Sequence, residues 1–228
     1  MISIENEKLR NAVKIVVPFL AVPMLVVLGA TLFDERRHII ISIGVALLAL
    51  VLFAAGYEKK PIGSRRMIIA AVIIAFCVAG RFIPFFKPIT ALTVISAVYL
   101  GGETGFLIGA MSAFLSNFYF GQGPWTPFQM LAWGMIGLIA GILAKPLKSH
   151  RAVLLVYGVL AGIFYSLIMD VWTVVWYDGS FRAELYLTAI ITALPHTIMY
   201  SVSNCIFMWF MAKPLGEKLE RVKIKYRI

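Results

Sequence analysis

A small set of polar side chains interrupts the otherwise apolar stretches of this sequence, and these residues are the first candidates for chemistry. They are Arg81, Lys87, Glu103, Asn117, Gln129, Asp170, His196 and Asn204. Charges and amides are costly inside a bilayer, so such residues mark a binding site, an ion path or a buried pair. Most of them fall in the outer halves of the spans assigned below. This distribution predicts a polar cup that is open to the outside and has an apolar floor.

Trp125, Gln129 and Trp133 are spaced four residues apart and would share one face of a helix. Two indoles that flank an amide suit a flat organic ligand with a polar edge. Gln122 comes just before this helix, in a Gly- and Pro-rich loop over residues 121–127 that we interpret as a lid or ligand contact at the mouth of the cup. The other candidate substrate-binding residues are Arg81, Phe85, Lys87, Asn117, Asp170, His196 and Tyr200.

Some of these residues also have a purely structural interpretation. Arg81 and Asp170 would neutralise each other if they met across the bundle. His196 follows Pro195, which removes a backbone hydrogen bond and kinks the helix. We expect the imidazole to form a hydrogen bond within the kinked bundle, and a ligand or metal contact is the alternative. No group of cysteine, histidine and acidic residues has metal-ligand spacing, so no metal site is predicted.

The elements that must position these residues are membrane helices. The chain has 228 residues, of which 61% are hydrophobic and only 14% charged, and its mean hydropathy is +0.90. Soluble chains carry about 25% charged residues, so a soluble globular domain is excluded and an all-α integral membrane protein is expected. Apolar runs predict spans at about residues 13–33, 39–57, 67–86, 89–100, 105–120, 127–144, 152–176 and 185–212. The run over 89–100 is too short to cross a bilayer and is expected to be broken or re-entrant.

Lysine and arginine orient this bundle. They gather in residues 58–66, in residues 145–151 and after residue 212, whereas residues 121–126 carry no charge. Under the positive-inside rule both termini are then cytoplasmic, with residues 215–228 as a basic tail. The formal net charge of +10 reflects this topology and contact with anionic lipid, and nucleic acid is not an expected partner.

Two classes of membrane protein compete with a binding subunit. The chain has no GxxxxGK[ST] or GxGxxG motif, so energy for transport must come from an ion gradient or a partner. A secondary transporter is disfavoured because no midplane carboxylate and no inverted repeat is detected. An intramembrane enzyme is disfavoured because neither HExxH nor GxSxG occurs.

Alanines recur every four residues at Ala71, Ala75 and Ala79. Such a stripe has two interpretations: close packing between helices of this chain, or a smooth docking face for another membrane protein. The spacing alone leaves both open.

With this stripe and two further segments, the chain resembles the substrate-binding S components of energy-coupling factor (ECF) transporters. The first segment is Arg81–Pro88, with the sequence Arg-Phe-Ile-Pro-Phe-Phe-Lys-Pro. The second is Gly101–Gly109, and the resemblance continues over Asn117–Gln129. The resemblance covers a six-helix substrate-binding domain at residues 64–214. It leaves residues 1–63 as an additional N-terminal pair of transmembrane helices, which the minimal family pattern lacks.

The resemblance implies a subunit of a multi-pass bacterial membrane transporter that binds a vitamin from outside. Ala71, Ala75 and Ala79 would dock on a transmembrane T component that is coupled to two ATPase subunits. ATP and Mg would be bound by those subunits, and this chain would be no enzyme and hold no cofactor. The chain looks most similar to the cobalamin-type S components, so cobalamin is the expected vitamin. Riboflavin, folate, pantothenate or a queuosine-like base, or a stand-alone secondary transporter, are the alternatives.

Overall fold

The computed structural model describes residues 6–32, 38–56, 63–84 and 87–226, and all regular elements within these ranges are helices. The all-α membrane fold is therefore confirmed. Two helical rods form the N-terminal pair. The first rod runs through α1 (Glu7–Val16), the π-helical segment η1 (Val17–Ala21) and α2 (Val22–Leu32), and the second rod is α3 (His38–Ala55). A larger body follows, with α4 (Gly63–Gly80), α5 (Ile89–Leu100), α6 (Gly102–Phe120), α7 (Trp125–Ile142), α8 (Ala144–Ser149), α9 (Arg151–Asp178) and α10 (Ala183–Tyr226).

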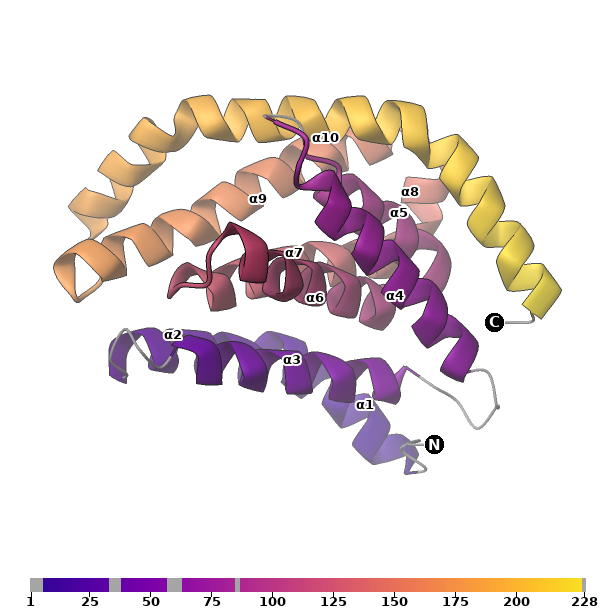
Figure 1. The fold of residues 1–228 in the computed structure, drawn as a ribbon, viewed down its shortest axis with the longest axis horizontal. Helices are drawn as coiled ribbons and strands as arrows, with labels where there is room; N and C mark the ends of the chain where they lie inside the picture. The colour runs from indigo at the N-terminus through magenta and orange to yellow at the C-terminus, as the bar shows by residue number, and fades with distance from the viewer. Residues whose placement is uncertain (1–5, 33–37, 57–62, 85–86, 227–228) are drawn as a thin grey trace.

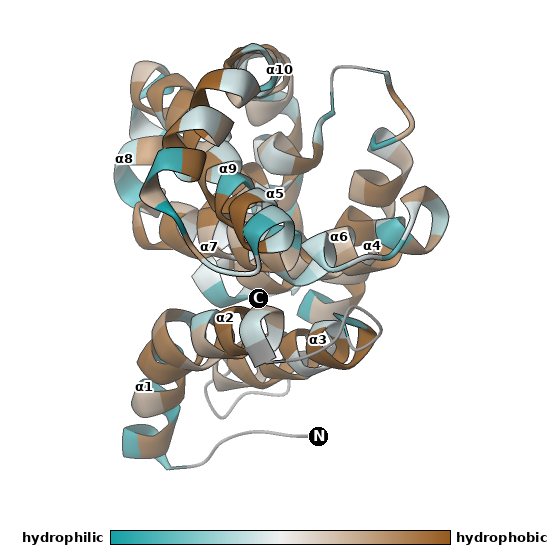
Figure 2. Ribbon diagram, turned by 90° about the vertical axis from the view of Figure 1, so that its left-hand side faces the viewer, coloured by the Kyte–Doolittle hydropathy of each residue, from teal (hydrophilic) through white to brown (hydrophobic). Residues whose placement is uncertain are grey.

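The N-terminal pair lies along one side of the body, while α10 arches along the opposite side (Figure 1). A view turned by 90° shows the pair as a layer of its own beneath the other helices (Figure 2). α6 and α7 form the centre of the body, since α3, α4 and α5 pack on α6 while α9 packs on α7. The central helices therefore meet protein on most sides.

Five helices among the described residues are long and apolar enough to cross a membrane: Glu7–Thr31, His38–Ala55, Trp125–Ile142, Arg151–Asp178 and Ala183–Tyr226. The other three expected spans also form helices, α4, α5 and α6, but do not belong to this set. α6 is rich in glycine, serine and threonine, and its side chains are largely buried. A helix that other helices cover does not need the apolar surface that lipid contact demands.

α5 has only 12 residues, and nearly all of its side chains are buried. Residues 89–100 form one continuous helix, so the expected break does not occur there, and the alternative of a re-entrant segment stays a prediction. The interruption comes instead at Gly101, whose φ of 99° turns the chain directly into α6. Glycine adopts such a positive φ without the steric cost that a side chain would add.

Glycines bring α6 and α7 into close contact. A Cβ on Gly105 would lie 2.7 Å from the carbonyl oxygen of Gly137, so neither helix has room for a side chain there. Small residues at such positions let two backbones approach within the membrane. This packing holds Asn117, near the end of α6, beside Thr126 and Gln129 in the first turns of α7.

α10 is one helix of 44 residues that contains Pro195 and Pro214. It packs mainly on α9, where a Cβ on Gly162 would lie 2.9 Å from the backbone nitrogen of Ser201. Asn204 donates from Nδ2 to the carbonyl oxygen of Gly158 at 3.0 Å across the same contact. α9 and α10 thus form a hairpin that carries aromatic side chains towards α7.

Candidate binding site

Four buried polar side chains, three of them on different helices and one directly after α4, form a continuous hydrogen-bonded chain, which we call the polar network. Arg81 follows α4 and donates from Nη1 to Asn117 Oδ1 at 2.7 Å and to the hydroxyl of Ser116. Asn117 donates from Nδ2 to Gln129 Oε1 at 2.8 Å. Gln129 in turn donates from Nε2 to the hydroxyl of Tyr165 at 3.1 Å. The network of Arg81, Asn117, Gln129 and Tyr165 therefore ties α4, α6, α7 and α9 together at one site.

Three aromatic side chains, which we call the aromatic wall, lie against this network. Trp133 and Tyr165 stack with ring centroids 4.6 Å apart and planes inclined by 28°. Tyr200 meets Tyr165 edge-on at 5.4 Å, and Trp133 Nε1 donates to Thr90 Oγ1 at 3.1 Å. The guanidinium of Arg81 lies 5.6 Å from the Trp133 ring centroid, within the range of a cation–π interaction. Stacked rings beside amides are the chemistry that recognises a flat ligand with a polar edge.

A small cavity opens beside the aromatic wall, between α5, α7, α9 and α10. It is lined by Lys87, Ile89, Thr90, Trp133, Gly162, Tyr165, Tyr200 and Asn204, and its volume is about 10 Å³. That is about the space for one water molecule. The wide open cup expected at this site is absent from the described residues. Buried polar groups without partners are costly, so the side chains bond to one another and close the space.

The polar network and the cavity bring together most of the expected binding residues. They contain Arg81, Lys87, Asn117, Gln129, Trp133 and Tyr200. Lys87 lines the cavity, and its Nζ lies 5.8 Å from the ring centroid of Phe120. Phe85, another expected contact, lies outside the described residues.

The expected ion pair between Arg81 and Asp170 does not form among the described residues. Arg81 is held instead by the oxygens of Ser116 and Asn117. Asp170 is buried on α9, with 7% of its surface exposed, and no described hydrogen bond joins it to the polar network. The partners of Arg81 are therefore the hydroxyl of Ser116 and the amide of Asn117, and not the expected carboxylate of Asp170.

Three other expected contacts lie apart from this cluster. Trp125 packs edge-on against Trp172 of α9, with centroids 5.8 Å apart. Gln122 donates from Nε2 to the carbonyl oxygen of Phe114 at 2.9 Å, which fixes the loop to α6. His196 is exposed on α10. No described hydrogen bond or ring contact joins these three residues to the polar network or the aromatic wall, so their role in binding stays a prediction.

Hydroxyl groups complete the site, and the sequence reasoning missed them. Tyr165 ends the polar network, Thr90 accepts from Trp133, and Thr126 Oγ1 accepts from Asn117 at 2.9 Å. Charged, amide and imidazole side chains stand out within apolar spans, whereas hydroxyl groups do not. The signals in the sequence are a tyrosine in the middle of a long apolar run, a threonine at the start of the run over 89–100 and a threonine directly before the run over 127–144.

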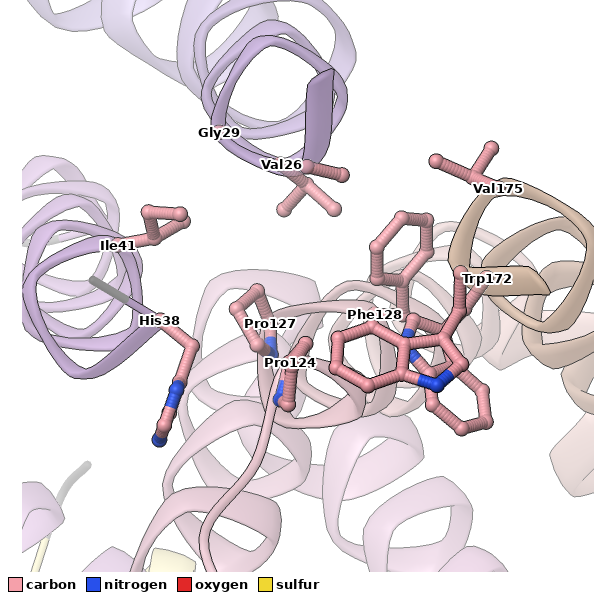
Figure 3. A pocket seen from close by; sticks show the side chains of 11 residues that line it. Val26, Gly29, His38, Ile41, Pro124, Pro127, Phe128, Trp172 and Val175 are labelled. Atoms are coloured by element: carbon pink, nitrogen blue, oxygen red, sulfur yellow. The ribbon is translucent and has the colours of Figure 1, made fainter. Parts of the chain in front are cut away.

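A second pocket, of about 270 Å³, lies between the N-terminal pair and the body (Figure 3). Val26 and Ile41 line it from the pair, Phe128 from α7 and Trp172 from α9. None of the expected binding residues that the structure describes lines this pocket. Specific sites combine apolar walls with a few convergent polar groups, so the polar network is the stronger candidate.

The alanine stripe of α4 faces away from the body. Ala71, Ala75 and Ala79 are exposed, whereas Ile73 and Cys77 of the same helix are buried. Internal packing therefore does not account for the stripe. Its role as a docking face stays a prediction.

A family model described as the S component of ECF-type riboflavin transporters matches residues 62–219, well over half of the chain. The chain belongs to this family. Comparisons with curated proteins and with solved structures gave no match.

The family match confirms the predicted S component but does not confirm the cobalamin type. An S component is the substrate-binding subunit of a membrane transporter and not an enzyme, and family membership implies a complex with a T component and ATPases. The match begins at residue 62, so α1 to α3 of this S component lie outside it.

Proposed function

We propose that this S component captures a flat vitamin of the riboflavin kind between the polar network and the aromatic wall. The observation that carries this proposal is the Trp133–Tyr165 stack beside the amide of Gln129. Planar heteroaromatic rings stack on such side chains, and an amide offers both a donor and an acceptor to a polar ring edge. The name of the matched family supports the same class of substrate.

Binding requires the site to open, since the ligand must replace bonds that the side chains now make with one another. Arg81 follows α4 and Lys87 precedes α5, so displacement of these two side chains would expose the aromatic wall and present two cations to the ligand. Cations favour ligands that carry acceptor oxygens. Cobalamin is far larger than a single flat ring system and would need the wide cup that the described residues lack.

Delivery to the cytoplasm is proposed to follow the mechanism that the resemblance implies. The T component docks on Ala71, Ala75 and Ala79, the bundle reorients in the membrane, and the partner ATPases supply the energy. The exposure of these alanines supports the first step. The chain alone should then bind the vitamin without accumulating it.

A vitamin titration of the detergent-purified full chain tests the proposal. Riboflavin fluorescence should be quenched saturably as its ring stacks on the aromatic wall, while calorimetry with cobalamin, folate and pantothenate should show no heat of binding. Saturable binding of cobalamin without riboflavin binding would restore the cobalamin assignment. Gradient-driven accumulation by the chain alone in proteoliposomes would instead support a secondary transporter.

A further inference from the structure

A pocket of about 300 Å³ lies at the end of the body far from the polar network, between α5, α8, α9 and α10. Tyr99 lines it, whereas Thr90 of the same helix bonds to the aromatic wall roughly 14 Å away along the helix axis. This end carries the basic segments at residues 145–151 and beyond residue 212. The positive-inside rule assigns it to the cytoplasmic face.

The floor of this pocket is apolar. It is formed by Ile95 and Val98 of α5, Leu147 of α8, Leu154 of α9 and Ala212 of α10. Such a floor has no polar group that could bind an aqueous anion, but it can bury a hydrocarbon chain.

The rim of the pocket is basic. Lys148, Arg151 and Lys213 line it, against the single acid Glu217. Arg151 is held in place because it donates to the carbonyl oxygen of Trp209 and lies 3.6 Å from the centroid of that ring.

The other charges of the rim differ in how far they are already paired. Lys148 Nζ lies 2.7 Å from a carboxylate oxygen of Glu220, and Glu217 lies 3.6 Å from Arg221. Lys213 is exposed and makes no ion pair within the described part of the chain. The rim therefore keeps an excess of positive charge, with Lys213 available to a ligand.

We propose that this pocket binds an anionic phospholipid of the cytoplasmic leaflet. The lipid phosphate would contact Lys213 and Arg151, and one acyl chain would lie over the apolar floor. Basic pockets between transmembrane helices on this side of a membrane are suited to anionic head groups. Beside the rim, Trp209 is 49% and Phe210 70% exposed, so the pocket adjoins lipid-facing surface. The inference does not depend on which vitamin the S component binds.

Native mass spectrometry of the detergent-purified full chain tests this site with phosphatidylglycerol and phosphatidylcholine added in equal amounts. The unaltered chain should retain phosphatidylglycerol preferentially. Lys213→Gln should lower that preference about fivefold, the effect of about 1 kcal/mol for one basic group near a lipid head group. Lys218→Gln is the matched control, because Lys218 is exposed on the same helix but does not line the pocket. It should change the preference less than about twofold.

A second variant tests the floor without changing any charge. Ala212→Phe should fill the apolar space and reduce retention of phosphatidylglycerol, while gel filtration shows that the chain stays monodisperse. Equal retention of the two lipids, or equal effects of Lys213→Gln and Lys218→Gln, would overturn the proposal. Displacement of the lipid by millimolar inorganic phosphate would also overturn it, since the site would then be a simple anion site.

Discussion

Gln129 is the central residue of the polar network, since it accepts a hydrogen bond from Asn117 and donates one to Tyr165. A buried amide that loses a partner costs about 1–3 kcal/mol. These bonds therefore stabilise the ligand-free site and set its cost of opening. They are also the groups that a ligand with a polar edge would use.

Gln129→Leu should weaken riboflavin binding about tenfold or more, because the ligand loses both a donor and an acceptor. Fluorescence quenching gives the dissociation constant. Gln122→Leu is the matched control, since Gln122 bonds to the backbone of Phe114 outside the network. Its effect should stay below about threefold, and an equal loss in the two variants would mean that the ligand also contacts the loop at residues 121–124.

Trp133→Leu should also weaken riboflavin binding by about tenfold, because the ligand loses the indole ring on which it would stack beside Tyr165. Trp125→Leu makes the same chemical change on the same helix, but Trp125 packs on Trp172 instead. The two indoles can be compared by titration calorimetry. A larger loss in the Trp125 variant would mean that the ligand lies near the loop at residues 121–124.

The sequence predicted the residues of this site better than it predicted their partners. Asn117 and Gln129 stood out because an amide in an apolar run is costly. The bonds to Tyr165 and Thr90 join helices that are distant in sequence. They depend on the rotation and height of each helix, which apolar spacing does not determine.

At the scale of helices, close backbone packing places these side chains. Gly105 and Gly137 allow α6 and α7 to meet, and the contact sets the distance between Asn117 and Gln129. The sequence predicted where helices form because apolar runs are long and distinct. It did not predict that α6 would be largely buried, since burial depends on which neighbours cover a helix.

Gly137→Val should lower the thermal unfolding temperature and abolish vitamin binding, because added bulk forces α6 and α7 apart at a cost of about 1–3 kcal/mol. Ile142→Phe adds volume to the same helix at a side chain that is 64% exposed, and it should change neither property. Thermal unfolding in detergent measures the first property and fluorescence quenching the second. An unchanged unfolding temperature in Gly137→Val would show that the two helices can separate freely.

Ala75→Trp should abolish vitamin uptake by the complete transporter while binding to the purified chain persists, because the bulky ring would block the proposed docking face. Ala75 is exposed on α4. Ile191→Trp, at a side chain of α10 that is 66% exposed, is the control and should leave uptake intact. Loss of vitamin binding by Ala75→Trp would mean that the stripe supports the fold of this chain.

At the scale of the whole molecule, an N-terminal pair of helices lies beside a body that the family match covers. The sequence suggests the same division, from the limits of the resemblance and from the apolar runs before it, and its meaning as a domain boundary stays a prediction. The second pocket between them was not foreseen, because it requires Phe128 and Trp172 to face Val26 across the two parts.

The orientation of the body can be tested with a membrane-impermeant maleimide. Ser180→Cys, between α9 and α10, should be labelled in intact cells, whereas His150→Cys, between α8 and α9, should be labelled only after the cells are permeabilised. The unaltered chain is the control, since Cys77 is buried and Cys205 half-buried. Labelling of His150→Cys in intact cells would show that the topology is the reverse of the expected one. The pocket with the basic rim would then lie on the outer side of the membrane.

The length of α10 has a practical consequence. Its 44 residues give a contour of about 66 Å, roughly twice the hydrocarbon thickness of a bilayer. This one continuous, arched helix contributes Tyr200 to the aromatic wall and has basic residues in its last turn. A fluorophore attached near Lys218 would therefore report on the tilt of α10. Its distance from a dye-labelled membrane surface would change if the bundle reorients during a transport cycle.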